Sequence, residues 1–195
     1  MRRLPTVLAM LVLLGGCGGA PPTDRTPDTG GPPSTAQARD NEFNATDVMF
    51  LQMLIPHHGQ GQTIVRLAAS RSGNERIRML ASAIDVTQAD EIKTMAGWLT
   101  SWGQPLQADE AAHAAHGGMP GTGAEEIAAL EKTSGTDFER AFLNMLIAHQ
   151  DDAVQVARME TAGGINPHAV ALAQRVDASR TAQIKQMLEL LKALR

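Results

Sequence analysis

Methionine and histidine recur at helical spacing in two stretches of the sequence. Met49, Met53 and His57 follow one another at intervals of four residues, and Met145 and His149 repeat the last interval. Because residues four apart lie on one face of a helix, a thioether sulfur and an imidazole nitrogen can meet there. Both groups are ligands that transition metals accept. The spacing makes Met53, His57, Met145 and His149 candidate ligands, although methionine at such spacing also serves as ordinary core filling.

The two stretches are copies of one segment. Residues 50–58 (FLQMLIPHH) return as residues 142–150 (FLNMLIAHQ), and residues 92–95 (IKTM) return as residues 184–187 (IKQM). The offset is 92 in both cases, 142 minus 50 and 184 minus 92. An offset preserved over both halves indicates a duplicated unit. His57 falls on the apolar face of its helical pattern, and so does its counterpart in the second copy, so the repeat predicts one inward histidine per copy.

Helix start and stop signals divide each copy into two helices. In the first copy, Thr46 and Asp47 are expected to cap a helix that stops near Gly73, and Asn74 is expected to cap the next helix. Pro56 falls inside the first of these helices, where it is expected to kink the chain.

The second copy carries similar signals. Thr136 and Glu139 have the spacing of a capping box, the Gly163–Gly164 pair favours a helix end, and Asn166–Pro167 favours a new start. The connections are short, and no segment alternates with the period of a strand. The sequence therefore predicts an all-α fold of two duplicated antiparallel helical hairpins.

The predicted domain boundaries follow from these signals. Hairpin one takes residues 44–102 and hairpin two takes residues 136–195. Between them, residues 103–135 are rich in Gly, Pro and Ala, and a short helix is expected at 125–132, capped by Thr122 and Glu125.

One carboxylate stands on an apolar helix face. Glu91 shares that face with Met95, and burying a carboxylate is costly unless it is paired, hydrogen bonded or bound to a metal. Glu91, Met95 and His58 are therefore further candidate ligands, and the alternative is that Glu91 is a buried partner for a histidine. The second copy has Gln183 in place of Glu91, as it has Gln150 in place of His58, so the two hairpins are not chemically equivalent.

The N-terminal segment has the features of an export signal. A basic start with Arg2 and Arg3 is followed by an apolar run over residues 4–14, too short to span a bilayer, and by Leu-Gly-Gly-Cys ending at Cys17. This ending resembles a bacterial lipobox, so we expect a signal peptide at 1–16 and acylation of Cys17 with fatty acids such as palmitate. Residues 17–40 are expected to be a disordered tether. The predicted product is a lipoprotein anchored at the extracytoplasmic face of a cell membrane.

Composition excludes several classes of function. Cys17 is the single cysteine among 195 residues, so the mature domain has no disulfides, thiolate metal sites or cysteine nucleophile. Once Arg2 and Arg3 leave with the signal, 15 basic residues face 21 acidic ones, a net charge of −6. Nucleic acid is therefore not expected as a partner.

Residues 41–195 resemble the bacterial domain-of-unknown-function family 305. The resemblance rests on residues 53–58 (MLIPHH), residues 145–149 (MLIAH) and residues 116–121 (HGGMPG). It implies an exported, ferritin-like four-helix bundle, and some members of the family are implicated in copper binding and copper tolerance outside the cytoplasm.

The resemblance makes copper the expected metal. Thioether and imidazole suit cuprous ion, whereas magnesium and calcium prefer oxygen ligands. The spacing of His113, His116 and Met119 in the connecting loop is also compatible with an accessory copper site, although an Ala- and Gly-rich loop can carry histidines without a role. This chain departs from the family where it has Gln150 in place of a second histidine. Leucine also replaces methionine at three positions, Leu54, Leu67 and Leu146.

Other functions fit the sequence less well. A di-iron oxidase would need a Glu-x-x-His element on two helices of the bundle, and the one present, Glu110 to His113, falls in the connecting loop. A serine hydrolase would need a Gly-x-Ser-x-Gly element after a strand. We therefore expect a metal-binding protein and not an enzyme. The alternative is a non-catalytic cell-envelope interaction lipoprotein with structural histidines.

Overall fold

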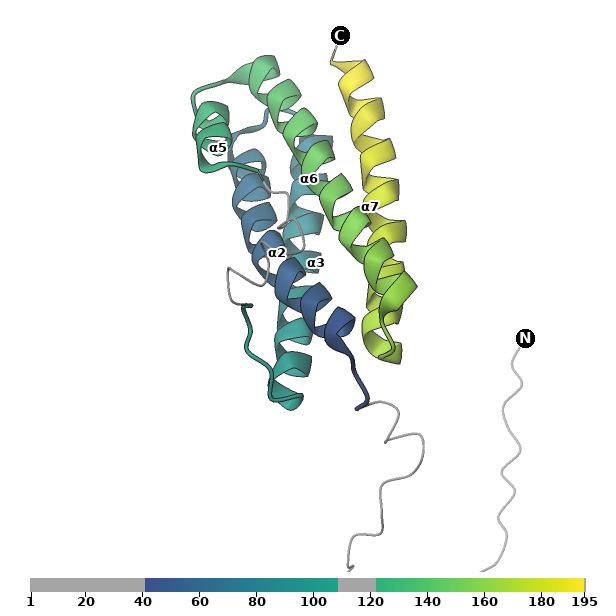
Figure 1. Cartoon of the computed structure of the whole chain (residues 1–195). Helices are drawn as coiled ribbons and strands as arrows, with labels where there is room; N and C mark the ends of the chain where they lie inside the picture. The colour runs from purple at the N-terminus through teal and green to yellow at the C-terminus, as the bar shows by residue number, and fades with distance from the viewer. Residues whose placement is uncertain (1–40, 109–121, 195) are drawn as a thin grey trace, which may run out of the picture. The chain divides into compact units, whose positions relative to one another are not determined.

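The computed structural model describes residues 41–108 and 122–194, and this part of the chain is helical without strands. Its helices are α2 (Ala45–Arg71), α3 (Glu75–Ser101), α5 (Ala124–Glu131), α6 (Gly135–Gly163) and α7 (Pro167–Ala193) (Figure 1). The predicted all-α class is therefore confirmed. Among these helices none is long and apolar enough to cross a membrane.

Several predictions concern residues outside the described part of the chain. The signal peptide at 1–16, the tether with Cys17 and the accessory ligands His113, His116 and Met119 all lie there. They stay predictions.

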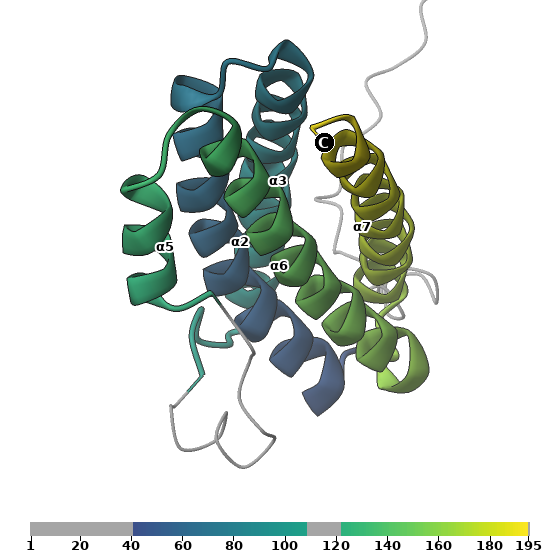
Figure 2. The same cartoon turned by 90° about the horizontal axis from the view of Figure 1, so that it is seen from above.

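The four long helices associate as two pairs of consecutive helices. Helix α2 packs against α3, and α6 packs against α7, each pair being joined by a connection of three residues (Figure 1). The two pairs meet mainly where α2 packs against α6, and the short α5 packs on α6 (Figure 2). Side chains on α2 and α6 are therefore the ones that can meet between the pairs.

The start of α2 differs from the prediction. The N-cap is Asn44, whose side-chain oxygen accepts hydrogen bonds from the backbone N–H groups of Thr46 (2.9 Å) and Asp47 (3.0 Å). Asp47 returns a bond by accepting from the Asn44 N–H at 2.7 Å, which makes it the third residue of a capping box. The prediction of Thr46 or Asp47 as the cap was wrong because both residues already lie in the first helical turn. Helix α2 continues through Pro56.

The caps of α3 and α7 were predicted correctly. The side-chain oxygen of Asn74 accepts from the N–H groups of Arg76 and Ile77, and that of Asn166 accepts from His168 and Ala169. In each case the residue before the helix is an asparagine with extended backbone, which is the preferred arrangement at this position.

The predicted capping box of α6 was wrong. The helix begins at Gly135 after Ser134, and the Glu139 carboxylate turns to the connection between α2 and α3. It accepts hydrogen bonds of 2.8 Å from the Ser72 hydroxyl and the Asn74 backbone N–H. The Glu139 carboxylate therefore makes a tertiary contact, although its spacing from Thr136 predicted a capping box within α6.

The short helix α5 lies one residue earlier than expected and is capped differently. Its N-cap is Gly123, and the Glu126 carboxylate accepts from the Gly123 N–H at 2.7 Å. Thr122 is instead held by Gln60 of α2. The amide nitrogen of that side chain donates to the Thr122 carbonyl at 2.6 Å, and its oxygen accepts from the Thr122 N–H at 3.0 Å.

The apolar core is divided into two clusters by a polar layer. One cluster takes α2 residues after the histidine pair and α6 residues before His149, such as Ile64 and Leu146. The other takes α2 residues before the pair and α6 residues after His149, such as Leu54 and Ala153. The layer between them contains the duplicated histidine motif.

Candidate functional site

The two inward histidines stack on each other between the helix pairs. The imidazole rings of His57 on α2 and His149 on α6 have centroids 3.8 Å apart and planes inclined by 7°. Their exposed fractions are 4% and 0%. The duplication therefore brings together the two residues that the sequence placed on equivalent inward faces.

Both rings are neutral at neutral pH. Burial, reinforced by the neighbouring histidine His149, lowers the pKa of His57 to about 2. Burial and the charge of His58 lower the pKa of His149 to about 4. A neutral imidazole keeps one nitrogen lone pair available as a ligand.

Three ring nitrogens of this pair have no hydrogen-bond partner among the described residues. They are Nδ1 and Nε2 of His57 and Nε2 of His149, whereas Nδ1 of His149 lies 3.4 Å from the Thr122 hydroxyl. A buried polar atom without a partner is costly, and a bound ion would supply one. The unpartnered nitrogens therefore fit a metal ion.

The stacking restricts how an ion could bind. A nitrogen lone pair lies in the plane of its ring, and nearly parallel planes do not direct two lone pairs at one point. One ion held by both imidazoles therefore requires at least one ring to rotate about its Cβ–Cγ bond. In the described ranges, 41–108 and 122–194, no group of three or more His, Cys, Asp or Glu side chains could hold a metal ion. Any site here relies on few ligands, with thioethers as the available additions.

The candidate methionines lie in different surroundings. Met53 and Met95 are buried in the same apolar cluster, the first with 6% and the second with 0% of its surface exposed. Met145 is half-buried and lines a pocket together with His149. Met145 is thus the methionine that shares a cavity with a candidate imidazole.

His58 takes part in a buried hydrogen-bonded group with Glu91. Its Nε2 lies 2.8 Å from a carboxylate oxygen of Glu91, and the guanidinium of Arg180 on α7 contacts the same oxygen. Burial would raise the pKa of Glu91, but the bond with His58 and the charge of Arg180 outweigh it and lower that pKa. Burial lowers the pKa of His58.

These protonation states fix the direction of the bond. A neutral His58 donates its Nε2–H to the ionised Glu91, which leaves a lone pair on Nδ1. That atom is buried and has no partner in the part of the chain that the structure describes. Glu91 is therefore the buried partner of a histidine, the alternative role that its sequence position allowed. Metal-binding histidines commonly have this arrangement, with the second ring N–H given to a carboxylate.

The family known as "Domain of unknown function (DUF305)" matches residues 47–191. The chain belongs to this family. No curated protein matches the sequence. The DUF305 assignment confirms the resemblance drawn from the duplicated motif.

Several solved structures are similar to this DUF305 chain. A putative secreted DUF305 protein from Streptomyces coelicolor has 26% identity and a TM-score of 0.72, covering 76% of this chain and 93% of its own. A DUF305 fragment from Deinococcus radiodurans has 26% identity and a TM-score of 0.66, covering 77% and 97%. CopM in its Cu(I)-bound form has 25% identity and a TM-score of 0.63, covering 77% and 98%. CopM has also been solved in Cu(II)-bound and Ag-bound forms.

Sequence reasoning missed Arg180, although the repeat contains the signal. Subtracting the offset of 92 from 180 gives Gln88, which shares the inward face of α3, and both side chains are fully buried. The amide of Gln88 has no hydrogen-bond partner within residues 41–108 and 122–194 and lies close to Gly61, as does Nε2 of His149. Adding the offset of 92 to the inward residue Gln88 would have indicated that Arg180 also faces inward.

The second copy of this DUF305 fold replaces the charged pair with a neutral one. Gln150 donates to the side-chain oxygen of Gln183 at 2.6 Å, at the positions that correspond to His58 and Glu91. The geometry of the bond is thus repeated while its charge is not.

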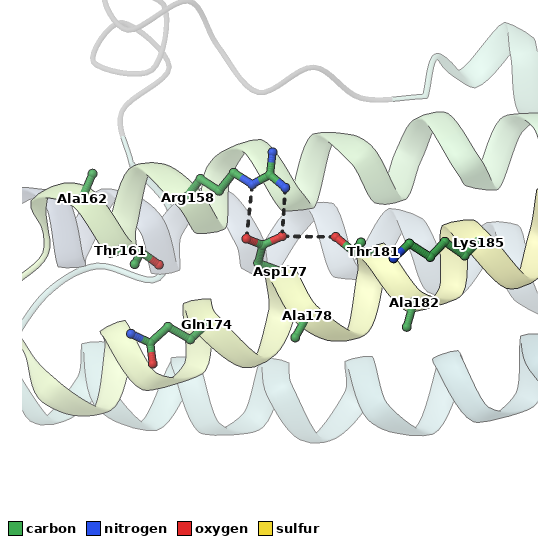
Figure 3. Close-up of a pocket in the computed structure, with 9 residues that line it drawn as sticks. All are labelled: Arg158, Thr161, Ala162, Gln174, Asp177, Ala178, Thr181, Ala182 and Lys185. Atoms are coloured by element: carbon green, nitrogen blue, oxygen red, sulfur yellow. Dashed lines mark hydrogen bonds and ion pairs between the residues drawn. The ribbon is translucent and has the colours of Figure 1, made fainter.

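A larger groove on the outer face of α6 and α7 carries no candidate ligand. It has a volume of about 600 Å³, and Arg158 there binds Asp177, which also accepts from the Thr181 hydroxyl (Figure 3). The same pair occurs in the first copy as Arg66 and Asp85. Because the pair recurs at the repeat offset and no His or Met lines the groove, its role is to join consecutive helices.

Proposed function

We propose that this DUF305 protein binds a soft transition-metal ion, copper in its cuprous state, through His57 and His149, and that it stores or buffers the ion and is not an enzyme. The observation that carries the proposal is the stacked, buried and neutral imidazole pair with three unpartnered nitrogens. Such a pair offers lone pairs without adding negative charge, which suits a singly charged ion with few ligands.

The fold proposed for this function is a ferritin-like four-helix bundle made of two duplicated antiparallel hairpins. The packing of α2 on α3, of α6 on α7 and of α2 on α6 supports it. In such bundles, metal sites are built in the core from side chains on facing helices. His57 and His149 have that position.

Neighbouring residues would complete the site. Met145 is the nearest candidate for a thioether ligand by its shared pocket, and Met53 precedes His57 by one turn on α2. His58, oriented by Glu91, offers a further imidazole nitrogen. Bound copper would be held by soft ligands at a buried position, and these side chains would shield the ion from solvent.

The similar structures support copper as the ion. CopM is similar over most of this chain and has been solved with Cu(I), Cu(II) and Ag. We further propose that the protein acts outside the cytoplasm, tethered to the membrane through lipid on Cys17, as the N-terminal sequence predicts.

Metal analysis and an anaerobic competition assay test the proposal. The purified full-length protein is titrated with Cu(I) held by a chromophoric chelator, and wild type should withdraw one ion. The double variant His57→Ala, His149→Ala should compete for Cu(I) at least tenfold less well than wild type. The control His168→Ala, at an exposed position in the first turn of α7, should compete as wild type does. Equal competition by the double variant would remove the assignment. No competition by wild type would favour the alternative, an interaction lipoprotein with structural histidines.

A further inference from the structure

A small pocket between α5 and α6 reaches His149 from the surface. It has a volume of about 220 Å³ and is lined by Thr122, Glu126, Met145, Ala148, His149 and Asp152. Met145, His149 and Asp152 come from one face of α6, since they are spaced by four and three residues. The pocket therefore leads from solvent to His149, whose side chain is fully buried and stacks on His57.

Among the described residues, apolar packing or a positive charge lies in the other directions from the imidazole pair. One apolar cluster lies on each side of the layer along α2 and α6. Toward α3 and α7, the carboxylate of Glu91 is paired with the buried guanidinium of Arg180, which repels an approaching cation. The pocket at α5 has no such positive side chain among its lining residues.

The pocket carries acidic groups and a soft one. Glu126 is exposed at its rim, and Asp152 lies deeper, where burial and the charge of Asp151 raise the pKa of its carboxyl. A partly desolvated carboxylate gains most from a nearby cation. The Met145 thioether lies beside these carboxylates, one turn before His149, and can receive a soft ion.

At the inner end, His149 is held loosely enough to exchange partners. Its Nδ1 contacts the Thr122 hydroxyl at 3.4 Å, a long hydrogen bond, and Gln60 fixes the backbone of Thr122 through two bonds. The rigid backbone and the weak contact together allow the ring to rotate without moving the pocket wall.

We propose that this pocket is the route by which a soft cation reaches the imidazole pair, with Glu126 and Asp152 attracting it and Met145 passing it to His149. This inference rests on the proposed function. Acidic side chains in a concave site raise the local cation concentration, so they act on the rate of capture more than on final affinity.

Kinetic measurements on the full-length protein test the route. The rate of release is measured by transferring Cu(I) anaerobically from the loaded protein to excess chromophoric chelator, and the dissociation constant by competition. The rate constant of capture is the rate constant of release divided by the dissociation constant. Ala148→Trp, at an exposed position of the pocket, should slow capture and release together by about tenfold or more and keep the dissociation constant within about twofold. Asn144→Trp, exposed on α6 outside the pocket, should change neither rate.

The charge variants provide a second test that does not depend on a bulky side chain. Glu126→Gln with Asp152→Asn should slow capture several-fold at about 0.15 M salt, where screening limits the effect to nearby charges. Glu125→Gln with Asp151→Asn removes the same charge from residues outside the lining and should leave capture within about twofold of wild type.

The outcomes separate this inference from the proposed function. If wild type binds Cu(I) and needs His57 and His149, but both pocket variants keep wild-type rates, only the route is wrong. The route is also wrong if the pocket variants change affinity without changing capture. If wild type binds no Cu(I), the proposed function and the route fail together.

Discussion

The guanidinium of Arg180 on α7 contacts the carboxylate of Glu91 on α3, so a buried ion pair links the two helix pairs. Arg180 has no exposed side-chain surface and Glu91 has 13%. His58 of α2 shares the same carboxylate oxygen. Desolvating these charges is costly, and the cost is offset only while all partners are present.

Removing one partner of this pair should therefore destabilise the fold. Arg180→Gln is expected to lower the free energy of unfolding by about 3–5 kcal/mol, because it leaves the Glu91 carboxylate buried with a single partner. Glu91→Gln should have a similar effect. The double variant should cost less than the sum, since it removes both charges and gives each position the glutamine that its counterpart in the other copy carries, Gln183 and Gln88. Urea denaturation measures all three.

The surface ion pair between Arg66 and Asp85 provides the control. Arg66 is 62% exposed, so Arg66→Gln should lower the free energy of unfolding far less than Arg180→Gln does. If Arg180→Gln cost no more than Arg66→Gln, the buried pair would have no special part in joining the helix pairs.

The inward placement of His57 and His149 could be predicted from the sequence because both signals are regular, whereas the stacking of their rings could not. Helical periodicity places each histidine on an apolar face, and the 92-residue offset makes the two faces equivalent. The starts of α3 and α7 could be predicted for a similar reason. The side chains of Asn74 and Asn166 accept hydrogen bonds from backbone N–H groups two and three positions further along the chain.

The features that were missed depend on contacts between distant residues. Glu139 does not cap its own helix because Ser72 and Asn74, more than sixty residues earlier, donate to its carboxylate. Arg180 was missed because its partner Glu91 lies on a helix of the other pair, and spacing within one helix carries no information about such a partner. Local patterns thus fix helices and faces, whereas they do not fix which polar groups meet between them.

The depressed pKa values of the stacked histidines predict that acid destabilises the protein. Below pH 6.5 the unfolded chain binds a proton at each histidine, whereas the native pKa is about 2 for His57 and about 4 for His149. The stability is therefore intact above pH 6.5 and decreases as the pH falls, by roughly 2 kcal/mol per histidine at pH 5. His149→Gln should lose roughly 2 kcal/mol less than wild type between pH 7 and pH 5 in urea titrations. Parallel losses in the two proteins would show that His149 titrates normally in the fold.

The raised pKa of Glu160 predicts that the protein also loses stability as the pH rises. Glu160 is fully buried at the end of α6, and burial together with the nearby Asp47 carboxylate raises its pKa to about 8. Its protonated form stabilises the fold fully below pH 4.5, and this contribution is lost as the pH rises through 8. Glu160→Gln is neutral, as the protonated carboxyl is, and does not titrate. Relative to this variant, wild type should lose at most roughly 1.4 kcal/mol per pH unit between pH 5.5 and pH 7.5. Glu189→Gln, an exposed position on α7, should follow wild type at every pH.

Two glycines of α2 give the closest test of the packing around the imidazole pair. A Cβ atom on Gly61 would lie 2.8 Å from Nε2 of His149 and from both amide atoms of Gln88, whereas a Cβ on Gly59 would meet nothing within 4 Å. Alanine is preferred to glycine inside a helix, so Gly59→Ala should raise the free energy of unfolding by about 0.5–1 kcal/mol and leave Cu(I) competition unchanged. Gly61→Ala must push both the Gln88 amide and the His149 ring away, so it should weaken Cu(I) competition by about tenfold or more. The second copy has Ala153 at the position that corresponds to Gly61, so α6 already carries the methyl group that the packing around Gly61 on α2 excludes. If Gly61→Ala bound Cu(I) as wild type does, the ion would not depend on the placement of the His149 ring, because that ring cannot keep its position beside the added methyl.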